Sequence, residues 1–235
     1  DGQLKLDADD LGYGYNLGVL VEPSQKTRLG LTYRSKIDLE FDDAVSARNL
    51  SPALSTILDL ALGSNRKVDM ELTVPQAVMF SVFHQLNDQW AIMGNVGWQD
   101  QSDFGETGIS LASSAGSNSV TADRNFHDTW HYAFGTQYRF APQWLLSAGV
   151  AYDDSPVDDE DRTPDMPLDR QIRYATGLQY DLSEDVTVGA AYTFLDTGDA
   201  KIEIDGADNP LRGELVGEYS SNYVNFFNVN IVYRF

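Results

Sequence analysis

The sequence predicts an all-β protein, an antiparallel transmembrane β-barrel whose strands face lipid on one side and water on the other. The clearest observation is residues 223–235, where Phe227, Val229, Ile231 and Tyr233 alternate with mostly polar residues. Successive side chains of a strand point to opposite faces, so this stretch has one apolar and one hydrophilic face. Similar alternation recurs along the chain, with aromatic residues near the strand ends, and this is typical of outer-membrane barrels.

Composition argues against several other classes of protein. No apolar run approaches the roughly 18 residues that a membrane-spanning helix needs. The chain has no cysteine, which rules out disulfides and thiolate metal sites. Its formal net charge of -20 argues against nucleic acid as a partner, because no basic patch is available to neutralise phosphates. No cofactor is expected.

The first two predicted strands cover about residues 3–21 and 27–41. In the first, apolar residues occupy odd positions from Leu11 onwards, and a β-bulge explains a change of phase near Asp9. The second alternates most regularly, with charged and polar residues between its apolar ones. The short turn 22–26 joins the two strands.

Residues 43–67 break the alternation and are predicted to contain a short helix in an extracellular loop. Ser51-Pro52 is a helix start with proline in the first turn, and helix formers continue to Gly63. Five apolar residues share one face of this helix: Leu50, Leu54, Ile57, Leu58 and Ala61. That face either packs on the rim of its own barrel or offers a hydrophobic ligand a landing site.

The remaining segments continue the strand pattern. Residues 68–86 and 89–99 form a hairpin, in which Pro75 marks a kink or a strand start. Residues 102–122, rich in Ser, Gly and Ala, are predicted to form a long loop. Five further strands are predicted at about residues 125–140, 144–152, 170–182, 186–195 and 223–235.

Short and long connections alternate along the whole chain. Short turns on one rim and long loops on the other are typical of outer-membrane barrels, whose long loops lie outside the cell. Nine strands is an odd number, whereas single-chain bacterial barrels have even numbers. We therefore expect the sequence to begin within a barrel, as part of a mature chain or a fragment, because no signal peptide opens it.

Residues 153–169 hold eight acidic residues and a single basic one, Arg162. One interpretation is a solvated loop. The other is a site for a divalent cation such as Ca²⁺, which prefers oxygen ligands. The spacing matches no EF-hand loop, so no metal ligand is assigned.

Several stretches, in order along the chain, carry a resemblance to a known family. They are GYGYNLGVLVEP (12–23), TRLGLTYRSK (27–36), PQAVMFSVFHQLNDQWAIMGNVGW (75–98), AGVAYDDSPVDDEDRTPDMPLDR (148–170) and the terminal YRF. These resemble the FadL family of outer-membrane transporters for long-chain fatty acids and other hydrophobic compounds. The resemblance implies a 14-strand barrel plugged by an N-terminal hatch. Residues 1–235 would then form a partial barrel domain, the C-terminal nine strands, without the hatch and about five strands.

The resemblance also implies the function and its partners. We expect passive transport of a long-chain fatty acid or hydrocarbon ligand through a plugged barrel in the bacterial outer membrane. Lipid and lipopolysaccharide would surround the barrel, and detergent would bind in crystals. Residues 43–67 would correspond to the fourth outer loop, half of the groove where ligand first binds. The family's Asn-Pro-Ala hatch motif and kinked third strand have no counterpart here, so gating cannot be mapped.

Inward-facing residues provide the predicted interior ligand site. Its members are apolar or cationic: Met79, Phe83, Leu145, Phe226, Arg139 and Arg173. A carboxylate head group needs a cation or donor in a partly dry site. Alternatively, each arginine forms a salt bridge to Asp181, Asp38 or Glu40 that holds the lumen closed.

Three other functions are a hydrolase, a general porin and a structural barrel or adhesin. A hydrolase needs a Ser/His pair, but no G-x-S-x-G motif lies near the histidines, and His84 is predicted to face lipid. We therefore expect no enzyme. A general porin and a structural barrel or adhesin remain alternatives, although apolar residues predicted to face the lumen argue against a wide aqueous pore.

Overall fold

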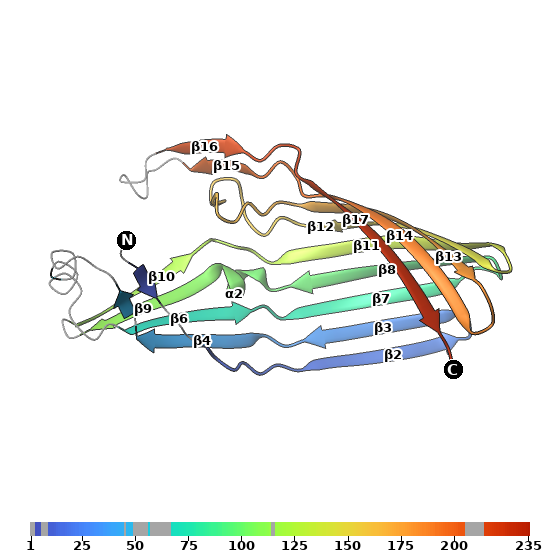
Figure 1. Ribbon diagram of the computed structural model, residues 1–235, viewed down its shortest axis with the longest axis horizontal. Helices are drawn as coiled ribbons and strands as arrows, with labels where there is room; N and C mark the ends of the chain where they lie inside the picture. The colour runs from blue at the N-terminus through green and yellow to red at the C-terminus, as the bar shows by residue number, and fades with distance from the viewer. Residues whose placement is uncertain are drawn as a thin grey trace.

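The computed structural model describes residues 3–5, 9–44, 46–48, 56, 67–113, 116–204 and 214–235. Nine strands form one antiparallel sheet, in the order β17-β14-β13-β12-β11-β8-β7-β3-β2 (Figure 1). They are β2 (Asn16–Ser24), β3 (Thr27–Arg34), β7 (Ala77–Gln85), β8 (Trp90–Gln99), β11 (Thr129–Ala141), β12 (Trp144–Asp153), β13 (Gln171–Asp181), β14 (Val186–Asp196) and β17 (Tyr223–Tyr233). Each corresponds to one predicted strand, so the nine strands and their order are confirmed.

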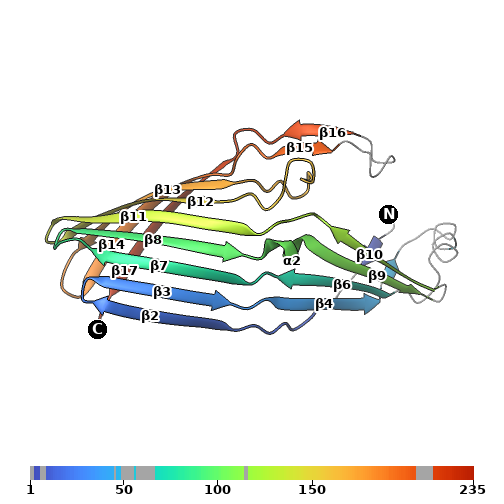
Figure 2. The ribbon, with the colours of Figure 1, turned by 180° about the vertical axis from the view of Figure 1, so that it is seen from behind.

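The sheet curls into a partial barrel. Figures 1 and 2, which view the chain from opposite sides, show β14 and β17 passing across one face of β3, β7 and β8. Within the described residues, the edge strands β2 and β17 each pair on one side only. The curl therefore gives the sheet a convex outer face and a concave inner face.

The apolar residues predicted to face outward lie on the convex face, uncovered by any second layer of the described chain. Val229 is 79% exposed, Ile231 is 73% exposed and Leu31 is 49% exposed. Only a few apolar side chains of the described residues are buried, namely Ala91, Phe126, Val157, Ala200 and Ile202. A water-soluble sandwich would bury its apolar strand faces, so this surface is suited to lipid.

Two predicted strands are each divided near the long-loop rim. Residues 27–41 separate into β3 and β4 (Ile37–Ala44), and residues 68–86 into β6 (Lys67–Val74) and β7. Pro75 has no N–H for the ladder, which explains the second break. At the first break Ser35 turns to Tyr15, because its N–H donates to the Tyr15 carbonyl (2.9 Å) and its hydroxyl accepts from the Tyr15 N–H (2.9 Å).

The first strand is shorter than predicted, since β2 begins at Asn16 and residues 9–15 form no strand. Those residues run beside β4, where Glu40 N–H donates to Asp10 (2.8 Å). A Cβ on Gly14 would lie 2.6 Å from Ile37 Cγ1. Glycine is thus required there by the close approach of the two segments, and it weakens the strand.

The prediction of a loop over residues 102–122 was wrong. This segment contains the short helix α2 (Gln101–Gly105) and a hairpin of β9 (Glu106–Ser113) and β10 (Gly116–Asp123). β9 pairs with β6, and together with β4 these strands form a second sheet that extends beyond the barrel. The hairpin has β6 as a neighbouring strand, and the Ser- and Gly-rich sequence gives no sign of this pairing.

Two small two-stranded sheets complete the described structure. β1 (Gln3–Lys5) pairs with β5 (Ser46–Arg48), and β15 (Lys201–Ile204) pairs with β16 (Leu215–Glu218). The helix predicted to start at Ser51, together with the five apolar residues between positions 50 and 61, lies outside the described residues apart from Thr56. Among the residues that are described, no helix combines the length and apolar character needed to cross a membrane.

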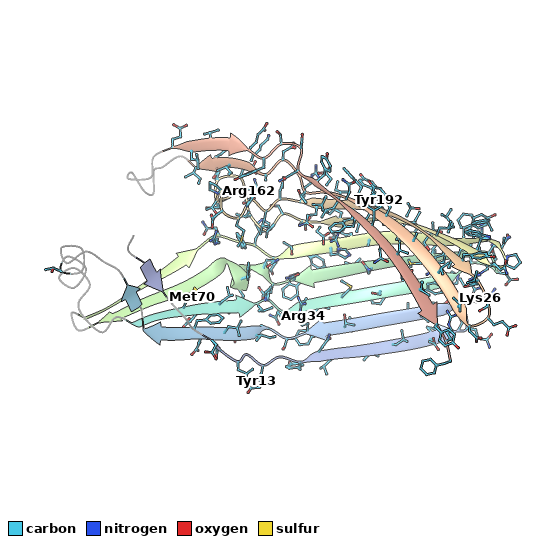
Figure 3. The ribbon with its side chains drawn as sticks, viewed as in Figure 1. Tyr13, Lys26, Arg34, Met70, Arg162 and Tyr192 are labelled. Atoms are coloured by element: carbon cyan, nitrogen blue, oxygen red, sulfur yellow. The ribbon has the colours of Figure 1, made fainter. Side chains whose placement is uncertain are left out.

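The acidic segment 153–169 folds around Arg162, whose side chain is only 2% exposed (Figure 3). Its guanidinium donates to the carbonyls of Leu168 (2.6 Å), Val157 (3.1 Å) and Lys201, and it pairs with Asp159 and Asp169. The segment is therefore ordered around a buried cation. No group of acidic or histidine side chains in the described part of the chain could hold a metal ion.

Further contacts tie this segment to its neighbours. Glu203 N–H donates to the Asp159 carbonyl (2.9 Å), which attaches the segment to β15. Arg124 donates to Asp165 (3.0 Å). Hydrogen bonds from Thr163 and Arg124 lower the pKa of Asp165 to about 2, so this carboxylate stays charged in mildly acidic solution. We refer to residues 154–170 with β15 and β16 as the outer lobe.

Candidate functional site

The concave face carries a hollow of about 650 Å³ near the middle of the strands. Strand register places the side chains of Arg28, Phe83 and Met93 on this face, because Arg28 lies opposite Phe83, and Phe83 lies opposite Met93. The lining is mostly apolar or small. Its larger apolar side chains on this face are Leu20, Phe83 and Met93. Val82, Phe134 and Val150 border the hollow, but strand alternation turns their side chains to the convex face, where they are exposed. A cavity of this size and character fits a small apolar ligand or part of a longer one.

A more polar hollow lies on each side of the apolar one. The first, about 360 Å³, is at the long-loop end and is lined by residues including Arg34 (Figure 3), Met79 and His131. The second, about 570 Å³, is at the short-turn end and is lined by residues including Arg139 and Arg234. The wall of the lumen is therefore polar, then apolar, then polar along the barrel.

The predicted interior residues are distributed over these hollows. Phe83 and Arg173 line the apolar hollow, Met79 lines the hollow at the long-loop end, and Arg139 lines the one at the short-turn end. Leu145 lies opposite Gln179, and Phe226 opposite Thr193, which places both on the concave face. Leu50, Leu54, Ile57, Leu58 and Ala61 lie outside the described residues.

A line of polar side chains crosses four neighbouring strands between the first two hollows. His131 on β11 has Nδ1 2.7 Å from Asp153 Oδ1 and Nε2 2.8 Å from Asn95 Oδ1. Arg173 on β13 donates to the other carboxylate oxygen of Asp153. Because a carboxylate only accepts, Nδ1 of His131 donates the hydrogen bond to Asp153. We call these four residues the polar belt.

Both predicted arginines are held in ion pairs. Arg139 lies 3.4 Å from Asp181, one of the partners that the sequence offered. Arg173 pairs with Asp153, which is not among the partners predicted from the sequence. The alternative in which these arginines form salt bridges is thus the arrangement observed, with one partner changed.

Arg28 differs from these two arginines. Its guanidinium carbon lies 4.3 Å from the centre of the Phe83 ring, and within the described residues it has no acidic partner. A cation over an aromatic face is stabilised without losing its charge. The alternation of the strand places Arg28 on the inner face, but the sequence gives no sign that Phe83 supports it.

The histidines form no catalytic pair with serine in the described structure. His84 lies 2.9 Å from the Thr27 hydroxyl, His127 lies 3.9 Å from Asp158, and His131 belongs to the polar belt. A nucleophile and its general base must lie within hydrogen-bond reach. The concave face offers cavities and fixed charges, which suit binding and passage.

Comparison with known sequences decides the family. A family described as "Outer membrane protein transport protein (OMPP1/FadL/TodX)" matches residues 1–235. The chain belongs to this family. It is therefore a bacterial outer-membrane protein of a family of transport channels rather than enzymes, and the resemblance seen in the sequence is confirmed.

Individual relatives agree with this assignment. A long-chain fatty acid transport protein of Escherichia coli O6:H1 is 31% identical over 195 residues, which cover 80% of this chain and 43% of that protein. A crystal structure of a Pseudomonas aeruginosa FadL homologue has a TM-score of 0.77 at 21% identity, covering 99% of this chain and 54% of that one. For the Pseudomonas putida toluene transporter TodX, the TM-score is 0.58 at 19% identity, with coverages of 99% and 52%. The chain thus spans about half the length of the relatives it matches, and the two structures support the fold.

Proposed function

We propose that the whole protein carries long-chain fatty acids or other hydrophobic compounds passively across the outer membrane. The observation that carries this proposal is the apolar hollow of about 650 Å³ on the concave face, between two more polar hollows. A water-filled porin would have a polar wall throughout. The E. coli relative named for long-chain fatty acid transport supports the same function.

Binding in the hollow needs no covalent chemistry. Each methylene removed from water contributes about 0.8 kcal/mol, so an apolar chain is held without specific polar contacts. A polar head group would be accommodated by Arg28 or the polar belt at the edge of the hollow. Flow would be driven by consumption of the compound inside the cell.

We propose that further strands and a hatch complete the barrel. The described edges β2 and β17 leave rows of backbone N–H and C=O groups unpaired, and a bilayer provides no water to satisfy them. Lipid and lipopolysaccharide would then contact the convex face, and a detergent molecule would occupy the hollow in crystals. The apolar residues of segment 50–61 would form part of the outer landing site.

Ala175→Trp tests the hollow directly. Ala175 lines it between Gly149 and Thr193, where small neighbours leave room for an indole. We expect oleate uptake by cells that depend on this protein to fall by about tenfold or more, the equivalent of about 1.4 kcal/mol. The control is Tyr174→Trp, which lies on the convex face and should leave uptake unchanged.

Three results would contradict the proposal. Unchanged uptake in a correctly folded Ala175→Trp protein would show that ligand does not pass through this hollow. A large, steady single-channel conductance for ions, without uptake of hydrophobic compounds, would instead indicate a general porin. Normal oleate uptake by cells that lack the protein would favour a structural barrel or adhesin.

A further inference from the structure

Arg173 connects the apolar hollow to the polar belt. Its side chain lines the 650 Å³ hollow, whereas its partner Asp153 lines the 360 Å³ hollow at the long-loop end. The ion pair between them therefore lies on the boundary that a molecule must cross to pass from one hollow into the other.

The guanidinium of Arg173 is incompletely satisfied. An arginine has five N–H donors, and Asp153 accepts from Nη2. Nε of Arg173 is buried and has no hydrogen-bond partner among the described residues. A buried donor without a partner is costly, and an acceptor on a ligand would satisfy it. A carboxylate binds a guanidinium through two parallel N–H groups, and Nε can be one of them.

Asp153 keeps a second donor if Arg173 leaves it. One carboxylate oxygen accepts from Arg173, and the other lies 2.7 Å from Nδ1 of His131. His131 is held in turn by Asn95. The side chain of Asp153 is 27% exposed, so water also reaches it. Its charge would therefore remain stabilised after the pair with Arg173 opens.

We propose that Asp153 is a built-in competitor for the carboxylate of the ligand. Asp153 pairs with Arg173, and a passing amphiphile with a carboxylate head replaces Asp153 and also accepts a hydrogen bond from Nε. This inference rests on the proposed function and names its substrate class: acidic amphiphiles, in preference to neutral hydrocarbons. Competition by Asp153 offsets part of the binding energy, which lets the ligand leave, as a channel requires.

The test compares oleate with oleyl alcohol, which has the same hydrocarbon chain and no charge. Binding of each would be measured on the full-length protein in lipid nanodiscs. Asp153→Asn is nearly isosteric and removes only the competing charge, so oleate should bind about tenfold more tightly while oleyl alcohol is unaffected. Arg173→Gln should weaken oleate selectively, and the double variant should behave as Arg173→Gln.

Asp181→Asn is the matched control, because it removes the same charge from the Arg139 pair at the short-turn end. It should leave the ratio of the two affinities unchanged. Asp153→Glu keeps the charge and should resemble the wild type, which covers the case in which Asp153→Asn does not fold.

Three outcomes would overturn the inference. In the first two, Asp153→Asn leaves oleate affinity unchanged, or Arg173→Gln weakens both ligands equally, while the wild type still binds them; the proposed function then survives. In the third, the wild-type protein binds neither ligand, and the proposed function fails together with the inference.

Discussion

Replacing Arg162 with methionine is expected to unfold the outer lobe while the nine-stranded sheet stays intact. Arg162 is 2% exposed, and its loss would leave Asp159 and Asp169 without their cation and three carbonyl groups without a donor. Breaking one side of a buried ion pair costs about 3–5 kcal/mol. Hydrogen exchange in nanodiscs should show lost protection over residues 154–170 and 201–204, with β11 to β14 protected as in the wild type.

Arg170→Met provides the control for this prediction. Arg170 has the same charge, but its side chain is 39% exposed and its ion pair with Asp196 is 3.7 Å long. Exposed pairs contribute at most about 1 kcal/mol, so protection of the outer lobe should change little. If Arg162→Met also left the lobe protected, the lobe would not depend on its buried cation.

Val229→Arg is the second substitution with a large expected effect. Val229 lies on the convex face of β17 and is 79% exposed. If that face contacts lipid, an arginine near the bilayer midplane should destabilise the folded protein in vesicles, making folding less favourable by about 2–4 kcal/mol. Urea titration of the full-length protein in lipid vesicles would measure the change.

The adjacent residue gives a matched comparison. Asn228 lies on the same strand, and its register opposite Ala191 places it on the concave face. Asn228→Arg adds the same side chain where water or polar groups can receive it, so the loss should stay below about 1 kcal/mol. Equal losses for both substitutions would mean that the two faces of β17 do not differ in their surroundings.

The strands could be predicted from the sequence because alternation is a local property. Phe227, Val229 and Ile231 show it without reference to any other segment. The hairpin of β9 and β10 could not, because its stability depends on pairing with β6. Of the two strand breaks, the one at Pro75 has a visible cause, whereas the one at Ser35 depends on Tyr15, 20 residues away along the chain.

The interior site was partly predictable for the same reason. The alternation of side chains along each strand is enough to place Phe83 and Arg173 on the inner face, and both line the apolar hollow. Alternation does not determine which side chains of neighbouring strands lie in contact. The Asp153 partner of Arg173 follows from the register of β12 with β13, which the length of the intervening loop does not determine.

Spin labels placed one at a time along β13 would test most directly whether these two faces have different surroundings. Residues 1–235 contain no cysteine, so a cysteine introduced on β13 places the label at one known position in this part of the protein. With the full-length protein in a bilayer, we expect collisions with lipid-dissolved oxygen to be frequent at positions 174, 176 and 178 and rare at 175, 177 and 179. Equal collision rates at all six positions, or the reverse order, would contradict a sheet with lipid outside and an enclosed hollow within.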